Sequence, residues 1–384
     1  MLWVVPNPSL AFVSATTGWR IAGQGLMPHL SGGLSAGPPP GTWPGDSLQA
    51  TTDGGATWTT VLTDAAGLWG LTFSGPTDGW AVGVDALYRT TDAGATWTPA
   101  GEPSTPLVRV AFAGAANGLG VTQGNALVHT TDGGETWDPV PSSPSPLGSV
   151  CFTGTGTAFA ASAHDGTIYA SNDGGVTWAA SLSDPIHLPA GAPPGLFHVD
   201  LACAGASVWT YGDFGSGAGA GNITSYYLIR STDDGATWRW AIDAVPGGIQ
   251  GAPVTPQGIA NLGEVAVPSA GLLVGLGNPA AVTGSIDILR STDAGATFST
   301  GAIRSVGPAA DAGPTVADQR LQGLFFLDPS TGWMQLSMSA SPDSPDTACI
   351  SYVFETRDAG QSWMQIWSSG VVASPVPSVA EPSP

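Results

Sequence analysis

Apolar residues in this sequence occur in short runs, and Gly, Pro, Ser, Thr and Asp separate one run from the next. The runs Gly79–Gly83 and Ala86–Thr90 are examples, because each is too short for a stable helix and ends at turn residues. Short runs of this kind, rich in Val, Thr, Trp and Phe, are typical of β-strands. The 55 glycines and 33 prolines also disfavour long helices. The pattern therefore predicts an all-β protein.

One motif recurs between these runs, and we call it the Asp box. It consists of Ser or Thr, any residue, Asp, any residue, Gly, any residue, Thr or Ser, and an aromatic residue. The seven copies are Thr51–Trp58, Thr90–Trp97, Thr130–Trp137, Ser171–Trp178, Ser231–Trp238, Ser291–Phe298 and Thr356–Trp363. Successive Asp residues are 39, 40, 41, 60, 60 and 65 positions apart, and a period near 40 is the length of a four-stranded propeller blade. The longer spacings indicate the same unit with loop insertions.

The residue types of the Asp box suit a hairpin turn. The Asp carboxylate can accept hydrogen bonds from N–H groups of the turn, and the Gly allows a positive φ angle. The Thr and the aromatic residue then restart a strand. The seven carboxylates thus have a structural explanation that needs no catalysis; they are Asp53, Asp92, Asp132, Asp173, Asp233, Asp293 and Asp358.

A second element precedes the boxes and supplies the first two strands of a blade. Phe73 followed by Gly79–Gly83 (Gly-Trp-Ala-Val-Gly) is the clearest copy. Inner strands are expected near residues 10–14, 69–74, 107–113, 148–153, 198–204, 263–268 and 320–327. The predicted fold is a seven-bladed β-propeller of four-stranded antiparallel blades with Asp-box hairpins.

Residues 1–367 are expected to form a single propeller, and residues 368–384, which are rich in Pro and Ser, a disordered tail. Trp3–Pro6 resembles the outer strand that follows an Asp box. This segment is expected either to join the last blade and close the ring of blades, or to be a remnant of an eighth repeat.

These motifs resemble the photosystem II assembly and stability factor family and its non-photosynthetic bacterial relatives. The resemblance is carried by the Phe, the Gly-Trp-Ala-Val-Gly run and the Thr-Thr-Asp-Gly-Gly-x-Thr-Trp boxes, and it covers about residues 1–367. It implies a non-enzymatic seven-bladed propeller that binds partner proteins. The Asp boxes alone also resemble those of sialidases, sortilin-type receptors and the xyloglucan-cleaving enzymes, which use two tandem propellers where this chain has room for one.

The resemblance to sialidases implies three Arg around a carboxylate, a Tyr nucleophile with a Glu partner, and an Asp acid. The Arg-Ile-Pro motif of that family is incomplete here, because Ala22 follows Arg20 and Ile21. Three arginines share one repeat position directly before a box, which favours a structural role: Arg89, Arg230 and Arg290. The arginines that remain as site candidates outside the repeat pattern are Arg109, Arg304 and Arg320.

Charge and composition exclude some classes of partner. Nine Arg against 29 Asp and Glu give a net charge of −20, which makes nucleic acid a poor partner. No stretch of 18 apolar residues exists, so membrane insertion is not expected. Charged residues make up only 10% of the chain, which favours an extracellular or cell-envelope protein of a GC-rich bacterium, although no signal peptide is visible.

The three cysteines are Cys151, Cys203 and Cys349, and their odd number and spacing disfavour a metal site. Cys203 falls where other blades place their inner-strand Phe. It is expected to be a small buried apolar residue. The alternative is a Cys151–Cys203 disulfide that crosses between neighbouring blades.

The long insertions fall on the face of the propeller opposite the Asp boxes, which we call the loop face. Asp boxes join the third and fourth strands of a blade, whereas the long segments join the second and third strands or one blade to the next. These segments are residues 24–46, 213–224, 278–284, 341–348, 184–196, 245–261 and 304–319. Loops on a rigid scaffold usually carry function, so we expect the binding surface there.

Five polar residues near the start of inner strands are candidates to line the mouth of the central channel: Arg109, His198, Asp200, Glu264 and Arg320. Such groups can hold a polar ligand or a peptide carboxylate, or they can bind water and one another. Trp43, in the loop 37–45, is expected either to stack on a sugar or anchor a partner, or to pack locally. Asp200 and Glu264 are also the carboxylates whose separation would matter for glycoside hydrolysis.

The sequence thus predicts a non-catalytic propeller that presents its loop face to a protein or surface-polymer partner, with no cofactor and no metal. The alternatives that the residues leave open are a sialidase-like exo-glycosidase and a carbohydrate-binding propeller.

Overall fold

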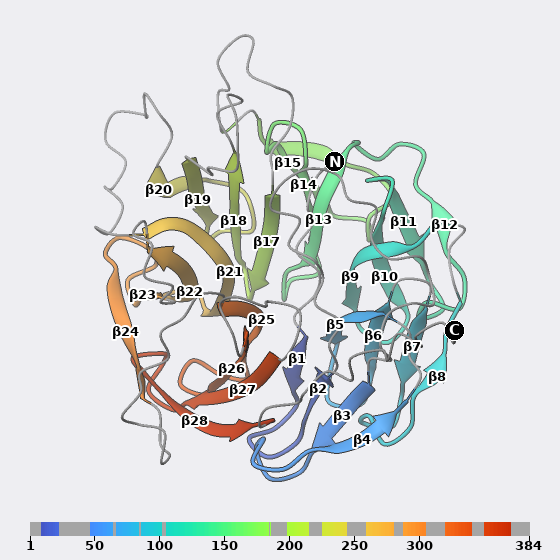
Figure 1. The fold of residues 1–384 in the computed structure, drawn as a ribbon. Helices are drawn as coiled ribbons and strands as arrows, with labels where there is room; N and C mark the ends of the chain where they lie inside the picture. The colour runs from blue at the N-terminus through green and yellow to red at the C-terminus, as the bar shows by residue number, and fades with distance from the viewer. Residues whose placement is uncertain are drawn as a thin grey trace, which may run out of the picture.

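The structure is a computed structural model that describes residues 9–22, 47–63, 67–83, 86–101, 105–183, 185, 198–214, 225–243, 259–279, 287–304, 319–339 and 349–369. These residues form 28 β-strands and no helix. The strands make seven four-stranded blades around a common centre, and the first strand of each blade lies innermost (Figure 1). The predicted seven-bladed all-β propeller is confirmed.

Each blade takes four consecutive strands. Blades 1 to 4 are β1 (Leu10–Phe12), β2 (Gly18–Ala22), β3 (Ser47–Thr51) and β4 (Thr59–Leu62); β5 (Leu68–Phe73), β6 (Gly79–Gly83), β7 (Leu87–Thr90) and β8 (Thr98–Pro99); β9 (Leu107–Ala113), β10 (Asn117–Thr122), β11 (Leu127–Thr130) and β12 (Asp138–Pro139); β13 (Leu147–Phe152), β14 (Ala158–Ser162), β15 (Ile168–Ser171) and β16 (Ala179–Leu182).

Blades 5 to 7 are β17 (His198–Ala204), β18 (Ser207–Phe214), β19 (Ser225–Ser231) and β20 (Arg239–Asp243); β21 (Ile259–Ser269), β22 (Leu272–Pro279), β23 (Asp287–Ser291) and β24 (Ser299–Arg304); β25 (Gln319–Phe326), β26 (Gly332–Ser339), β27 (Cys349–Thr356) and β28 (Ser362–Ser368). The inner strands overlap all seven predicted ranges. Two of them, β9 and β17, coincide with the prediction, and β21 is longer at both ends.

Neighbouring strands within a blade are antiparallel, and blade 2 shows how the repeat sets their register. Gly79 pairs with Phe73 on β5 and with Thr90, the first residue of the Asp box, on β7. The aromatic ring of Phe73 covers Gly79 so closely that a Cβ atom there would lie 2.4 Å from it. This close approach explains why glycine precedes Trp80 in the repeat.

The register defines two equivalent positions in every blade. The Phe position is the place of Phe73, and it holds Phe12, Phe73, Phe112, Phe152, Cys203, Val267 and Phe326. The Trp position is the place of Trp80, and it holds Trp19, Trp80, Leu119, Phe159, Trp209, Val274 and Trp333.

The interface between two neighbouring blades, which we call a seam, is held by the same aromatic pair in three places. The Trp of one blade stacks on the Phe of the next, with centroids 4.7, 3.5 and 3.7 Å apart in Trp19–Phe73, Trp80–Phe112 and Trp333–Phe12. These indoles also donate a hydrogen bond to a glycine carbonyl in the Asp box of the next blade, respectively Gly94, Gly133 and Gly54. Buried aromatic area therefore joins the blades.

The ring of blades closes where blade 7 meets blade 1 (Figure 1). Trp333 of β26 provides the aromatic contact just described, and Gln335 Nε2 donates to the Ile21 carbonyl at 3.1 Å. Trp3–Pro6 lies outside the described residues, so its place in the last blade stays a prediction. Blades 6 and 7 share a link that the sequence did not predict, because β24 and β28 pair in parallel.

Cys151 of β13 and Cys203 of β17 form a disulfide between blades 4 and 5, with their Cα atoms 6.0 Å apart. The expectation that Cys203 is an unpaired buried thiol is therefore wrong, and the alternative of a bridge between blades is the arrangement found. Inner strands of neighbouring blades converge on the centre, which brings the two side chains within bonding reach (Figure 1).

The described residues include no helix that is long and apolar enough to cross a membrane. The predicted domain limits, residues 1–367 and 368–384, stay predictions, because the described part of the chain begins at residue 9 and ends at residue 369.

Candidate functional site

The seven Asp boxes form the same closed turn. In blade 1, the Thr51 and Thr57 hydroxyls donate to the Asp53 carboxylate at 2.8 and 2.5 Å, and the Thr57 N–H donates to it at 2.9 Å. The side-chain and backbone bonds from Thr57, followed by the bond from Thr51, hold the pKa of Asp53 at about 2, well below its ordinary value. Equivalent hydrogen bonds lower the pKa of four further box carboxylates to about 2, namely those of Asp92, Asp132, Asp233 and Asp293. These acids are committed to the turns.

The face that carries the Asp boxes is built from short turns that bond to one another. In blade 3, the Gly133 N–H of the box donates to the Ala116 carbonyl in the turn between β9 and β10 at 2.8 Å. Equivalent backbone bonds tie box to inner turn in five further blades, their donors being Gly54, Ala93, Asp234, Ala294 and Ala359. This face therefore leaves little backbone free for a partner.

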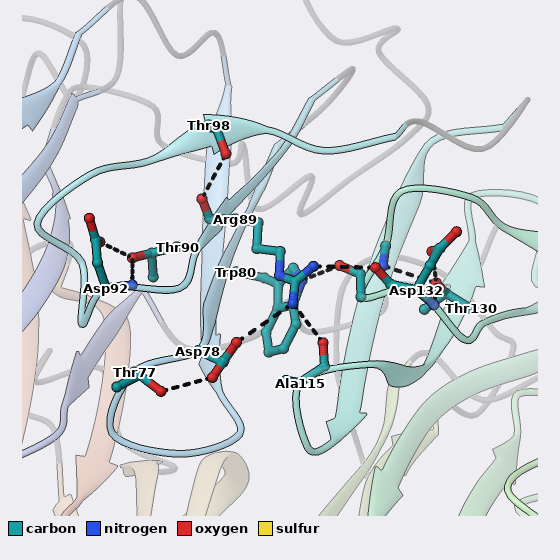
Figure 2. Close-up of polar contacts among 12 residues, drawn as sticks. Thr77, Asp78, Trp80, Arg89, Thr90, Asp92, Thr98, Ala115, Thr130 and Asp132 are labelled. Carbon is teal, nitrogen blue, oxygen red and sulfur yellow. Dashed lines mark hydrogen bonds and ion pairs between the residues drawn. The ribbon is translucent and has the colours of Figure 1, made fainter.

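Arginines that precede a box bridge to the next blade, as their shared repeat position indicates. Arg89 donates to the carbonyls of Asp132 and Ala115 in blade 3, at 3.2 and 2.9 Å, and lies 3.6 Å from Asp78 (Figure 2). Arg290 Nε donates to the Ala359 carbonyl of blade 7 at 2.6 Å. The structural role predicted for these two arginines is confirmed.

The candidates that the structure brings together lie at the propeller axis. We define the axis position as the residue that lies three positions before the Phe position in each inner strand. In blade order it holds Ser9, Gly70, Arg109, Ser149, Asp200, Glu264 and Gly323. Three of the predicted candidates, Arg109, Asp200 and Glu264, thus occupy equivalent places in blades 3, 5 and 6.

Arg109 reaches past blade 4 and pairs with Asp200. Their side chains form an ion pair, and the two residues are only 7% and 3% exposed. A serine, Ser149, stands at the axis position of blade 4, and its hydroxyl donates to Asp200 Oδ1 at 2.5 Å. The small side chain in the middle blade lets the arginine reach a carboxylate two blades away.

The same network continues into blade 6. Tyr211 of β18 donates to Asp200 Oδ2 at 3.1 Å and accepts a bond from the Val265 N–H of β21 at 3.4 Å. The Leu201 N–H donates to Asp200 Oδ1 at 2.8 Å. Both oxygens of Asp200 are therefore engaged, and a continuous polar chain links the inner part of blades 3 to 6. This arrangement matches the alternative in which channel groups bind one another.

The other predicted candidates cannot be placed in the same detail. The structure describes the backbone of His198, Glu264 and Arg320, which belong to β17, β21 and β25, but not their side chains. Trp43 lies outside the described residues. The separation of the Asp200 and Glu264 carboxylates, and every binding role of these residues, stays a prediction.

Sequence reasoning missed Ser149 and Tyr211 as members of the axis network. Ser149 carries a signal, since it occupies the same repeat position as Arg109 and Asp200. Tyr211 pairs directly with Asp200 across β17 and β18, so an aligned repeat would have placed it beside that acid.

Arg20 is a second buried cation. Sequence analysis noted it only as part of an incomplete sialidase motif and did not predict its burial. It is 3% exposed in the seam between blades 7 and 1, where Nε and Nη2 donate to Gln49 Oε1 at 2.9 and 2.7 Å. Its guanidinium lies 3.6 Å from the ring centroid of Trp367. Burial lowers the pKa of Arg20 to about 9, and no carboxylate of the described residues pairs with it.

The described residues do not assemble the site that a sialidase needs. Tyr211 and Asp200 form a tyrosine–acid pair, Arg109 is the arginine that approaches it among the side chains that the structure describes, and the three residues are at most 7% exposed. In the described part of the chain, His, Cys, Asp and Glu form no cluster of three or more that could hold a metal ion.

Comparisons with known proteins agree with this architecture. The family model described as photosynthesis system II assembly factor YCF48 matches residues 55–218. A structure of YCF48 bound to a D1 peptide has a TM-score of 0.52 at 16% identity, covering 87% of this chain and 90% of that one. YCF48 from Cyanidioschyzon merolae gives a TM-score of 0.52 at 14% identity, covering 88% and 94%.

A structure of an ancestral GH74 enzyme is also similar, with a TM-score of 0.50 at 11% identity over 96% of this chain and 48% of that one. At these identities the solved structures establish the fold alone. No curated protein sequence matches this chain. Together with the family model, the comparisons confirm the predicted resemblance to YCF48-like propellers.

Proposed function

We propose that this chain is a non-catalytic propeller that binds a segment of another protein on its loop face. The family match over residues 55–218 supports a protein partner, because a similar propeller, YCF48, is known in complex with a D1 peptide. Binding of a surface polysaccharide at the same face is the broader form of the proposal that the sequence suggested.

The observation that carries the proposal is that the two faces of the propeller differ in the length of their connections. On the Asp-box face, backbone bonds tie six of the seven box turns to the inner turns of their own blades, and the box carboxylates accept bonds within the turns. The strand ends of the opposite face bound the longest connections of the chain, which are residues 23–46, 183–197, 215–224, 244–258, 280–286, 305–318 and 340–348. These connections belong to blades 5, 6, 7 and 1, which are neighbours in the ring (Figure 1).

The axis network supports a role for the scaffold in this proposal. Arg109, Asp200 and Tyr211 tie together the inner strands of blades 3 to 6, so the loop face would be presented by a framework that changes little on binding. Rigid presentation lowers the entropy lost when a partner binds, because fewer groups must be ordered.

Peptides selected by the wild-type chain from a random phage-displayed library provide the test. We expect these peptides to bind at least tenfold more weakly to variants in which residues 215–224 or 280–286 are replaced by a short Gly-Ser linker. The matched control is Val176→Ser, because Val176 is 54% exposed on the Asp-box turn of blade 4. Selected peptides that lose affinity only for Val176→Ser, and tolerate both loop replacements, would refute the proposal.

The absence of catalysis needs its own assay. We expect no turnover of a fluorogenic sialoside above the uncatalysed rate. Turnover by the wild-type chain that is abolished in Tyr211→Phe would assign a glycosidase function instead, since that substitution removes the hydroxyl bonded to Asp200.

We also propose that the protein works outside the cell or in the cell envelope. The Cys151–Cys203 disulfide supports this location, because disulfides persist mainly in oxidising compartments. The test is mass spectrometry of the protein isolated from its own cells in the presence of an alkylating agent. Alkylation of all three cysteines without prior reduction would contradict the proposal.

A further inference from the structure

The stacked Trp–Phe pair joins blades 1 and 2, 2 and 3, and 7 and 1, and the seam between blades 4 and 5 is one of the four that lack it. Its Trp position holds Phe159, and its Phe position holds Cys203 instead of a ring that would stack on Phe159. The residue opposite Cys203 has changed with it. Val208 stands where Phe73 of blade 2 requires Gly79, because no aromatic ring needs the space over its Cβ atom.

A covalent bond occupies this seam instead. Cys203 is bonded to Cys151, which is 9% exposed and lies on the neighbouring inner strand. The bridge belongs to an apolar cluster that includes Phe159, Val199 and Val208. The exchange of a stacking Phe for a bonded Cys keeps the two blades joined through a much smaller side chain.

Apolar and polar contacts both cross this seam. Phe159 meets Trp238 of blade 5 edge to face, with ring centroids 6.4 Å apart. The Gly154 N–H donates to the Gly205 carbonyl at 2.8 Å, and the Thr155 hydroxyl donates to Asp234 Oδ2 at 2.5 Å. Polar contacts of this kind compete with water once a seam begins to open, whereas a buried aromatic stack does not. The disulfide adds a covalent bond to these contacts, at the Phe position, where three other seams have a stacked ring.

We infer that the Cys151–Cys203 disulfide is a redox-controlled brace that takes the place of the aromatic stack, so that its reduction loosens the seam between blades 4 and 5 selectively. Reduction would leave two thiols beside Phe159, whose aromatic neighbour across the seam is the edge-to-face ring of Trp238. The seams with stacked Trp–Phe pairs do not depend on this disulfide and would keep their contacts, as in Trp80–Phe112.

The reduction step needs only a dithiol. One thiolate of the dithiol attacks a sulfur of the bridge, forms a mixed disulfide and releases the other cysteine as a thiolate. The second thiolate of the dithiol then displaces the first cysteine and closes its own disulfide. The two cysteines gain two electrons and two protons in total, and the dithiol loses them. Oxidation is the reverse reaction, with the disulfide form of a dithiol as the oxidant.

Hydrogen exchange followed by mass spectrometry tests the inference on the full chain. The background variant is Cys349→Ser, which removes the third thiol and leaves the bridge in place. After treatment with dithiothreitol, we expect amides of the loosened seam, such as Gly154 and Leu201, to exchange at least tenfold faster. Amides at the seam of blades 2 and 3, such as Gly133, should be unchanged and serve as the internal control.

Two further variants distinguish loss of the disulfide from a general destabilisation of the protein. Cys151→Ser combined with Cys203→Ser should exchange like the reduced protein whether or not dithiothreitol is present. Cys151→Ala with Cys203→Phe and Val208→Gly rebuilds the aromatic repeat against Phe159, and it should recover slow exchange that dithiothreitol does not alter.

The inference is overturned if the oxidised and reduced proteins exchange alike, or if reduction accelerates exchange equally at every seam. It is also overturned if the denatured, unreduced background variant contains two alkylatable thiols. Should the rebuilt variant fail to fold, the comparison of the background variant with and without dithiothreitol still decides the question.

Discussion

Substitution of Asp200 by Asn should destabilise the propeller by about 3–5 kcal/mol, the range typical of breaking a buried ion pair. The estimate follows from the burial of both partners, since Arg109 is 7% exposed and Asp200 is 3% exposed. Asparagine keeps an oxygen that can accept from Ser149 and the Leu201 N–H, so the main loss is the charge that compensates Arg109. A buried guanidinium without a carboxylate then carries most of the cost.

The substitution of the arginine gives a double-mutant cycle with a clear expectation. In Arg109→Met, the Asp200 carboxylate keeps three donors, namely Ser149, Tyr211 and the Leu201 N–H. In the double variant neither charge is buried, so the summed losses of the single variants should exceed its loss by about 2–3 kcal/mol. The matched control is Arg357→Met, whose partner is Glu355 but whose side chain is 75% exposed, and it should cost at most about 1 kcal/mol.

Urea unfolding followed by tryptophan fluorescence measures these free energies, and the selected peptides measure binding by the same variants. We expect the unfolding midpoint to fall in Asp200→Asn with little direct effect on peptide affinity under native conditions. An unchanged midpoint together with lost peptide binding would refute the structural role argued for this pair and identify it as part of the ligand site.

Three further outcomes are expected. Five Asp-box carboxylates have a pKa of about 2 in the folded protein, against an ordinary value of 3.8. The stability that they contribute is therefore complete above about pH 4 and is lost as the pH falls toward 2. Thermal unfolding midpoints measured from pH 7 to pH 2 should stay constant down to about pH 4 and then fall. Gly79→Ala should lower stability by about 1–3 kcal/mol, because its Cβ would lie 2.4 Å from the Phe73 ring, whereas Gly75→Ala, with no atom within 4 Å, should be near neutral in the same urea assay. Trp80→Phe keeps the stack but loses the bond to the Gly133 carbonyl at 2.8 Å, and calorimetry should show a loss of about 1–2 kcal/mol.

Much of the fold was predictable because every blade repeats the same local chemistry. An Asp box closes its turn with bonds between residues at most four positions apart, such as Thr51, Asp53 and Thr57. Interactions over so few residues depend little on the rest of the chain. Because the box occurs seven times, the number of blades could be predicted from the sequence. The structural role of Arg89 and Arg290 could be inferred because both directly precede a box.

The candidate site was predictable only in part. Arg109 and Asp200 were both placed near the start of inner strands, yet 91 positions separate them in the sequence. Their pairing depends on how far three blades converge at the axis and on the small size of Ser149 between them. No local pattern encodes that convergence, because it is a property of the closed ring.

The disulfide and the pairing of outer strands β24 and β28 were likewise not determined by local sequence patterns. The turns, the strands and their order follow from local sequence, because they depend on neighbours along the chain. The tertiary structure alone decided that Cys151 bonds to Cys203, that β24 pairs with β28, and that Arg20 is buried at the closing seam. Each of these contacts lies between blades, where the spacing is set by all seven units packing around one axis.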